Sequence, residues 1–337
     1  MKRHAKRYMP FPFLPALLAL FGSAVSMAAE PGGMLRLGVP DGGNSFPRRA
    51  AEVIAERIAD AAGGARVTIA DGGNQAGSGV WRPLQDGRLE VGVVSAAEIA
   101  SRFPGFAALN TPFVFADLDA AERFYFGEGG ARVAALAARR DVTVAAWFGA
   151  DAPFLLSRVP LESVESVKGL RAAFDSASPA VEIFRSLGAE ASVRPYRDRL
   201  AAFVDGIYDV VELDPSGLAE GELPPEGIHA YHSGYVFPFW AICFSGAAAK
   251  MAPEATLSAL VQGARAGAAA AEAVLGEASA AAYAVLSRRG ASFNALNADL
   301  FAAAAGPAAD SAVATADAVV LEEINKIKTI KNQDDTE

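Results

Sequence analysis

The sequence has few of the side chains on which metal sites and nucleophilic enzymes depend. Its 337 residues include one cysteine and three histidines. A single cysteine excludes an internal disulfide, and Cys243 lies in the apolar stretch 239–244, which predicts a buried, unreactive thiol. His229 and His232 have no further metal ligand at a suitable spacing, so we expect surface histidines and no metal site.

The motifs of common enzymes are missing as well. The sequence contains no Gly-x-Ser-x-Gly elbow and no Ser-x-x-Lys, and its glycine clusters fit neither a phosphate loop nor a dinucleotide fingerprint. Asp209 and Glu212 lie three apart on an expected strand and so point to opposite faces, while Glu212 and Asp214 share a face but lack any companion signal. We therefore predict that the protein is not an enzyme and uses no cofactor; a periplasmic enzyme is the minor alternative.

The composition indicates a large, acidic, exported protein. With 52% hydrophobic residues, the chain can bury more than one core. Basic residues precede an apolar run from Phe11 to Val25 and a small-residue site at 26–28, as in a secretory signal peptide, and prolines within the run argue against an uncleaved anchor. Removing residues 1–28 changes the formal net charge from −9 to −13. We expect a periplasmic protein that binds no nucleic acid.

Strands and helices alternate along the mature chain, which predicts an α/β fold with mostly parallel sheets. Residues 253 to about 289 contain no further proline after Pro253 and are rich in alanine. They predict one helix on the order of 50 Å long that braces two lobes. The expected organisation is a first lobe at 30–151 completed by about 240–289, a second lobe at 152–239, and a C-terminal helical segment with a polar tail at 290–337.

One stretch, Lys168–Ser176, is expected to hold the bound molecule and to be where the chain turns from one lobe into the other. It predicts a short buried strand whose last residues, Asp175 and Ser176, cap the next helix. Ligands of open α/β sheets bind at the carboxyl ends of strands. The repeated Asp-Gly-Gly-Asn at 41–44 and 71–74 follows two expected strands and also favours a binding edge, although ordinary turns explain either copy alone.

Four stretches, taken in order, resemble the DctP-type extracytoplasmic solute receptors of tripartite ATP-independent periplasmic (TRAP) transporters. They are Gln85–Gly92, Leu109–Phe115, Ser163–Leu170 and Asp205–Glu212. The resemblance implies a two-lobed fold like that of periplasmic binding proteins, with strands that cross between the lobes. It also implies a ligand enclosed between the lobes, closure on binding, and delivery to integral TRAP membrane subunits. Such receptors mostly bind organic acids, through an arginine on the strand after the third stretch.

This chain departs from the family at that arginine. Ala173 occupies its position, and Arg171 lies where the family usually has lysine. Because side chains alternate along a strand, Arg171 and Ala173 share a face, so Arg171 either reaches the pocket or is a solvated arginine. Without an arginine fork a monocarboxylate loses its bidentate anchor. Candidate ligands then include compounds that carry hydroxyl groups, cyclic compounds and cations.

Aromatic and polar side chains supply the remaining site candidates. Phe174 and Phe239 are predicted as stacking walls, with core packing as the alternative for each aromatic residue. The full predicted set of ligand-binding residues is Asn74, Ser95, Trp147, Arg171, Ala173, Phe174, Asp209, Glu212, Tyr235 and Phe239. The predicted function is solute capture for a TRAP transporter. The alternative is a periplasmic subunit that senses the ligand for a membrane signalling partner.

Overall fold

The computed structural model describes residues 34–40, 48–71, 79–175, 178, 180–220, 224–297, 300–304, 306, 318 and 320–326. The strands are β1 (Met34–Val39), β2 (Arg66–Asp71), β3 (Val91–Ser95), β4 (Val142–Gly149), β5 (Phe154–Ser157), β6 (Arg171–Phe174), β7 (Glu190–Val193), β8 (Val210–Leu213), β9 (His229–His232), β10 (Phe239–Ser245) and β11 (Ser292–Ala295). The helices are α1 (Arg48–Ala61), α2 (Trp81–Gln85), α3 (Ala96–Arg102), the 3-10 helix η1 (Pro104–Asn110), α4 (Leu118–Tyr125), α5 (Glu128–Ala138), α6 (Val164–Val167), α7 (Ala180–Ser186), α8 (Tyr196–Val204), α9 (Pro215–Glu220), α10 (Gly246–Met251) and α11 (Glu254–Arg288).

The first lobe is built on a five-stranded sheet in the order β2-β1-β3-β10-β4. β1 pairs in parallel with β2 and β3, whereas β10 runs antiparallel to β3 and β4. Both faces of this sheet are covered, and β10 shows how: Ala241 and Cys243 join one hydrophobic cluster, while Ile242 and Phe244 join another. The period-two alternation of an apolar strand therefore fills two cores at once.

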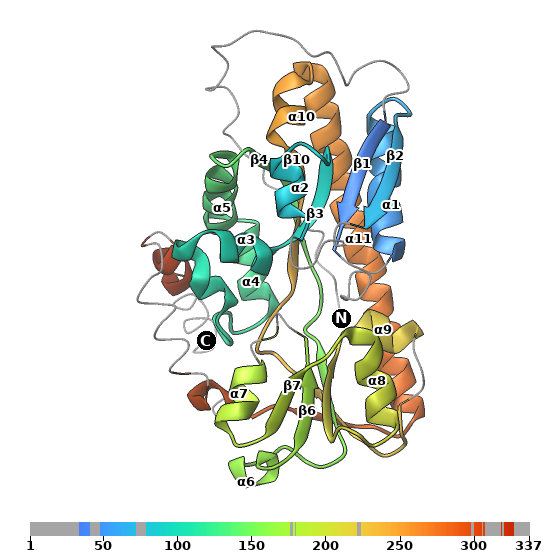
Figure 1. Cartoon of the computed structure of the whole chain (residues 1–337), viewed down its shortest axis with the longest axis vertical. Coiled ribbons are helices and arrows are strands. Elements are labelled where there is room, and N and C mark those ends of the chain that lie inside the picture. Colours follow the sequence, from blue (N-terminus) through green and yellow to red (C-terminus); the bar gives the residue numbers. More distant parts are fainter. Residues whose placement is uncertain are drawn as a thin grey trace, which may run out of the picture.

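The second lobe is built on a six-stranded sheet in the order β11-β9-β5-β8-β6-β7. Here β5 is the strand that runs antiparallel to its neighbours β8 and β9. Ala172 and Phe174 of β6 face one hydrophobic cluster, and Ala173 faces another. Figure 1 shows the two sheets at opposite ends of the molecule, with long connecting segments between them.

In each sheet, the carboxyl ends of the parallel strands lie at the edge that faces the other sheet. β4 ends at Gly149, and the chain enters β5 at Phe154 after a short segment. Because β5 is antiparallel to β8 and β9, its first residue lies beside their carboxyl ends: Phe154 pairs with Leu213 and with His232. The chain returns from β9 through residues 233–238 into β10, which begins opposite the end of β4. Residues 150–153 and 233–238 are thus two crossing segments that leave from facing edges.

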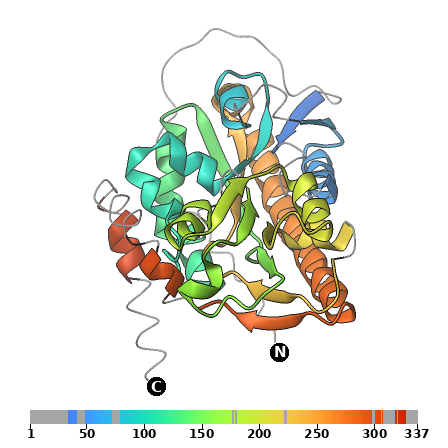
Figure 2. The same ribbon diagram turned by 60° about the horizontal axis from the view of Figure 1, so that its bottom comes forward.

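Helix α11 follows almost the whole length of the molecule, and in Figure 2 it runs diagonally from the centre to the lower right of the view. It packs on α1 and β4 in the first lobe and on α9 in the second. By length and composition this helix is long and apolar enough to cross a membrane. In this structure its small residues allow it to pack closely against α1. The predicted bracing helix from 253 to about 289 is confirmed almost to the residue.

Two glycines of α11 allow that close approach to α1. A Cβ at Gly263 would stand 2.8 Å from the carbonyl oxygen of Arg57 and 3.0 Å from the Cα of Ile58. Gly267 likewise faces the backbone of Ile54, at 3.1 Å. Backbone atoms cannot rotate away as a side chain can, so a methyl group at Gly263 has to separate the two helices.

We expect Gly263→Ala to lower the free energy of unfolding by about 1–3 kcal/mol, because it overpacks this helix contact. The matched control is Gly276→Ala on the same helix, where a Cβ meets nothing within 4 Å. That change should raise the free energy of unfolding by up to about 1 kcal/mol, through helix propensity alone. Urea denaturation of both variants measures the difference, and equal effects would contradict the packing argument.

Several expected elements differ from the structure. The turn from one lobe to the other occurs at residues 150–153, before β5, and not at 168–176. Residues 293–295 pair in parallel with β9 as β11, although their surroundings predicted a helix. The helix after β6 begins at Ala180, whose N–H donates to Ser178 Oγ at 3.2 Å, so Asp175 is not its cap.

Candidate functional site

A cluster of buried and half-buried polar side chains lies at the carboxyl edge of the second sheet, the edge that faces the first lobe. Its members are Asp175, Ser178, Arg199, Glu212 and Tyr235, here called the buried polar cluster. Asp175 directly follows β6, Glu212 lies near the end of β8, and Tyr235 belongs to the second crossing segment. Tertiary structure therefore gathers at one point residues that are far apart in the sequence.

Glu212 is the centre of the cluster, and its side chain is 6% exposed. Its Oε2 accepts hydrogen bonds from the Ser178 hydroxyl, at 2.7 Å, and from the Tyr235 hydroxyl. Its Oε1 faces Arg199 Nη1 and the backbone N–H of Asp175, each at 3.5 Å. These contacts match the roughly four lone-pair positions of a carboxylate. Glu212 therefore holds Tyr235 and Arg199 in place and is less suited to serve as a direct acceptor for a ligand.

Arg199 supplies the positive charge of the cluster from α8. Its side chain is 1% exposed, and its two terminal nitrogens lie 3.5 Å from Glu212 and 3.5 Å from Asp175. Both distances exceed the 2.7–2.9 Å that is usual for a charge-assisted hydrogen bond. The guanidinium is thus shared between two carboxylates without a tight fork to either.

Burial sets the protonation of Glu212. Removal from water raises the pKa of its carboxyl group above the ordinary range, although the hydroxyls of Ser178 and Tyr235 and the charge of Arg199 oppose the shift. Burial, together with the adjacent Glu212 carboxylate, also raises the pKa of the Tyr235 phenol. Tyr235 accordingly remains a neutral hydroxyl that donates to Glu212.

The raised pKa of Glu212 predicts a pH-dependent stability. The folded state binds this proton more tightly than the unfolded chain, so the resulting stabilisation is complete at low pH and is lost as pH rises through the folded-state pKa. The Glu212→Gln variant has no titrating carboxyl group at this position, so it lacks this pH-dependent contribution. The stability of the wild type relative to this variant should fall as pH is raised from about 4 to about 8. Thermal melts across that range measure it, with the exposed Glu182→Gln as the control for charge removal; a constant difference would contradict the assignment.

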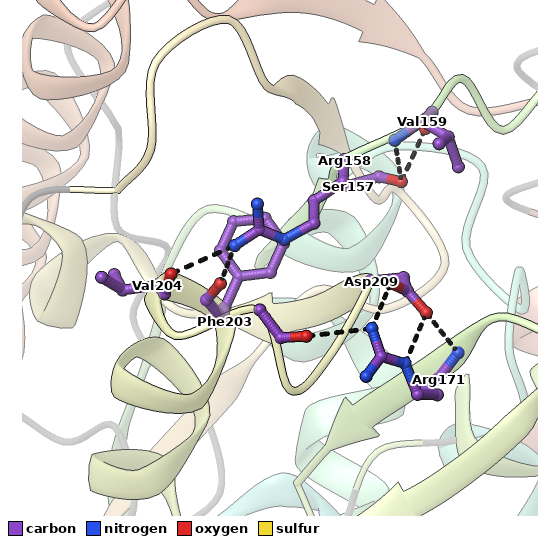
Figure 3. A network of polar contacts seen from close by, with 8 residues as sticks. Ser157, Arg158, Val159, Arg171, Phe203, Val204 and Asp209 are labelled. Atoms are coloured by element: carbon purple, nitrogen blue, oxygen red, sulfur yellow. Dashed lines mark hydrogen bonds and ion pairs between the residues drawn. The ribbon is translucent and has the colours of Figure 1, made fainter.

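Two predicted site residues, Arg171 and Asp209, are paired with each other at the opposite edge of the sheet. Arg171 opens β6 and Asp209 precedes β8, so both lie at the amino ends of these parallel strands. The guanidinium contacts both oxygens of Asp209, at 2.7 and 3.0 Å (Figure 3). Arg158, also in Figure 3, donates to the carbonyl oxygens of Phe203 and Val204 beside them. The prediction that Arg171 and Asp209 face the ligand is therefore not supported by the structure.

Ala173 and Phe174 also differ from their predicted roles. Neither has exposed surface. Ala173 packs in one cluster of the second lobe, and Phe174 lies on the other face, with its ring centroid 4.8 Å from that of Phe184. Phe174 is therefore a core residue and not a stacking wall, which was the alternative that the sequence left open.

The first-lobe candidates lie at the edge that faces the second lobe. Ser95 ends β3, and its Oγ accepts from the Glu98 N–H at 3.0 Å as the cap of α3. Trp147 lies near the end of β4, and Phe239 opens β10 opposite Gly149. The remaining candidate, Asn74, falls outside the described residues.

The structure also identifies two cluster residues that the sequence did not single out, Arg199 and Ser178. Arg199 lies one helical turn before the buried Phe203, on the inward side of α8. An arginine on the apolar side of an expected helix was the available signal, since fully buried arginines are rare unless paired. Ser178 gave no signal, because its role depends entirely on its contact with Glu212.

Comparison with known proteins shows that this chain is similar to bacterial solute-binding proteins. Residues 50–205 match the family described as "Bacterial extracellular solute-binding protein, family 7", or DctP. A solute-binding protein from Chromohalobacter salexigens is 24% identical over 156 residues. That match spans 46% of this chain and 46% of the relative, so it covers about half of that protein's length.

Solved structures share the fold over most of the chain. A TRAP periplasmic solute-binding protein from Chromohalobacter salexigens, with bound D-glucuronate, has a TM-score of 0.72 at 19% identity and covers 88% of this chain and 99% of its own. One from Ochrobactrum anthropi has a TM-score of 0.74 at 18% identity, covering 89% and 96%. A Bordetella pertussis receptor binding pyroglutamic acid has a TM-score of 0.72 at 15% identity, covering 88% and 100%. These similarities confirm the predicted two-lobed α/β fold.

Proposed function

We propose that this chain, whose residues 50–205 match the DctP family of bacterial extracellular solute-binding proteins, is a receptor of that kind. It captures a small organic molecule between its lobes and delivers it to a TRAP-type membrane transporter. The observation that carries the proposal is the buried polar cluster, at the edge where the strands of the second sheet point toward the first lobe. Ligands of α/β sheets bind at that edge.

Binding by such a protein is a shift between open and closed states. A ligand that contacts both lobes only when they are close together stabilises the closed state by its differential contacts. The two crossing segments are the places where such a movement is absorbed, since they are the direct links between the sheets. Helix α11 packs on both lobes and therefore also connects them.

The ligand class follows from the cluster and from the relatives. The similar proteins described above bind D-glucuronate and pyroglutamic acid, both organic acids. In this chain Ala173 stands where related receptors have the arginine that binds an acid. Arg199 is a buried cation at the corresponding edge, and it already lies between Asp175 and Glu212. We propose a small polar organic ligand whose charged end, where it has one, lies against Arg199.

The remaining roles follow from the same family. Receptors of this kind bind solutes and are not a class of enzymes, and they act in the periplasm. For this chain we propose periplasmic export after cleavage of the N-terminal signal and delivery to integral TRAP subunits. A sensing role would instead require a signalling partner in place of these subunits.

A thermal-shift screen of the mature protein tests the proposal. The probes are D-glucuronate, L-pyroglutamate, D-glucose and glycine betaine, each with a titration calorimetry follow-up. A ligand that binds only the folded protein raises its melting temperature, and above Kd the stabilisation grows with the logarithm of the ligand concentration. X-ray scattering should then show a more compact molecule with the bound probe. Flat melting curves with every probe and unchanged scattering would overturn the proposal.

A further inference from the structure

Three aromatic rings form a compact group at the first-lobe edge, beside both crossing segments. Tyr125 ends α4, Trp147 lies two residues before the end of β4, and Phe239 begins β10. The Tyr125 and Phe239 rings are stacked, with centroids 4.4 Å apart and planes at 19°, and the Tyr125 and Trp147 centroids are 5.1 Å apart. We call these three residues the ring trio.

The backbone around the ring trio fixes its position. A Cβ at Gly149 would stand 2.7 Å from the Phe239 ring, so this ring lies directly over the glycine from which the chain leaves for the second lobe. Trp147 lies two residues earlier on the same strand and therefore on the same face as Gly149. The ring trio thus sits at the end of the first lobe where the chain crosses to the second.

One member of the ring trio carries a buried hydrogen-bond donor that has no acceptor among the described residues. Trp147 is 4% exposed, and its buried indole Nε1 has no partner. Tyr125 is 3% exposed, and its ring contacts those of Trp147 and Phe239, which places its hydroxyl in the same group. Burial raises the pKa of the Tyr125 phenol, so it stays a neutral donor. Buried donors are almost always paired in native proteins.

We propose that the Trp147 indole N–H and the Tyr125 hydroxyl form a first-lobe subsite for an uncharged acceptor oxygen of the ligand, a hydroxyl or a carbonyl group. This inference rests on the proposed function and assigns the polar, uncharged part of the solute to the ring trio. The part of the ligand next to that oxygen lies against the edge of the stacked rings.

The uncharged character follows from the surroundings. Neither Trp147 nor Tyr125 carries a positive charge, and both lie in an apolar cluster with Phe124 and Phe115. A carboxylate buried among such rings without a counter-charge is strongly unfavourable, whereas a hydroxyl or carbonyl oxygen regains there the hydrogen bonds that it loses on leaving water. The charged end of a ligand is better placed at the second lobe, where Arg199 lies.

The experiment removes one donor at a time and keeps the ring. Tyr125→Phe and Trp147→Phe are compared with the wild type by titration calorimetry using D-glucuronate, L-pyroglutamate, D-glucose and glycine betaine. The matched controls are Tyr283→Phe, on an exposed tyrosine of α11, and Trp81→Phe, a buried tryptophan of the same hydrophobic cluster. Melting curves establish that each variant is folded before binding is measured.

For a probe with a hydroxyl or carbonyl group, each ring-trio variant should bind about tenfold more weakly, and the controls should bind as the wild type does. Glycine betaine, whose oxygens all belong to its carboxylate, should be unaffected by either change. Affinities equal to the wild type for every bound probe would overturn the subsite and show that water satisfies these donors. Binding of glycine betaine alone would overturn the subsite but leave the proposed function standing, while no binding to the wild type would overturn both.

Discussion

Replacing Arg199 with methionine is expected to lower the free energy of unfolding by about 3–5 kcal/mol, the cost of leaving a buried charge without its partner. The guanidinium is 1% exposed and lies 3.5 Å from both Glu212 and Asp175. Methionine fills much of the space but returns no charge, so two carboxylates would face each other across an apolar side chain. Guanidinium chloride denaturation measures the loss, and calorimetry should show weaker binding of whichever probe the wild type binds.

Two further variants separate this effect from the loss of any arginine. Arg185 on α7 pairs with Glu182 at 2.6 Å but is 48% exposed, so Arg185→Met should cost less than about 1 kcal/mol. Adding Glu212→Gln to Arg199→Met should restore part of the lost stability, because one of the stranded charges is removed. If Arg199→Met and Arg185→Met were equally mild, Arg199 would not be the central cation of the cluster.

Local sequence patterns were sufficient to predict long elements, in which the same kind of residue recurs over many positions. The proline-free, alanine-rich stretch that became α11 was predicted at both ends, because its pattern extends over the whole helix. The short strands were harder. β5, β9 and β11 have four residues each, which is too few for a period to show, and β11 exists only because β9 offers it an edge.

The site was less predictable than the fold, for a physical reason. Alternation along β6 indicates which residues share a face, but not which end of the strand faces the ligand. Arg171 and Asp209 therefore matched a plausible pattern and yet meet each other at the amino ends of their strands. Arg199 became identifiable only when β6, β8 and α8 had brought Asp175 and Glu212 to it.

Phe174→Ala is expected to lower the free energy of unfolding by about 3–5 kcal/mol and to leave ligand affinity unchanged in the molecules that remain folded. Its ring has no exposed surface and packs on Phe184, which in turn contacts Phe301 at 5.4 Å, so truncation opens a cavity in the second lobe. Phe293→Ala is the control, since that ring is 44% exposed and should cost within about 1 kcal/mol. Phe174→Leu, which opens a smaller cavity, allows binding to be measured on a stable protein. A large loss of affinity in this variant would return Phe174 to the ligand site, because a residue confined to the core acts on stability and has no direct contact with the ligand.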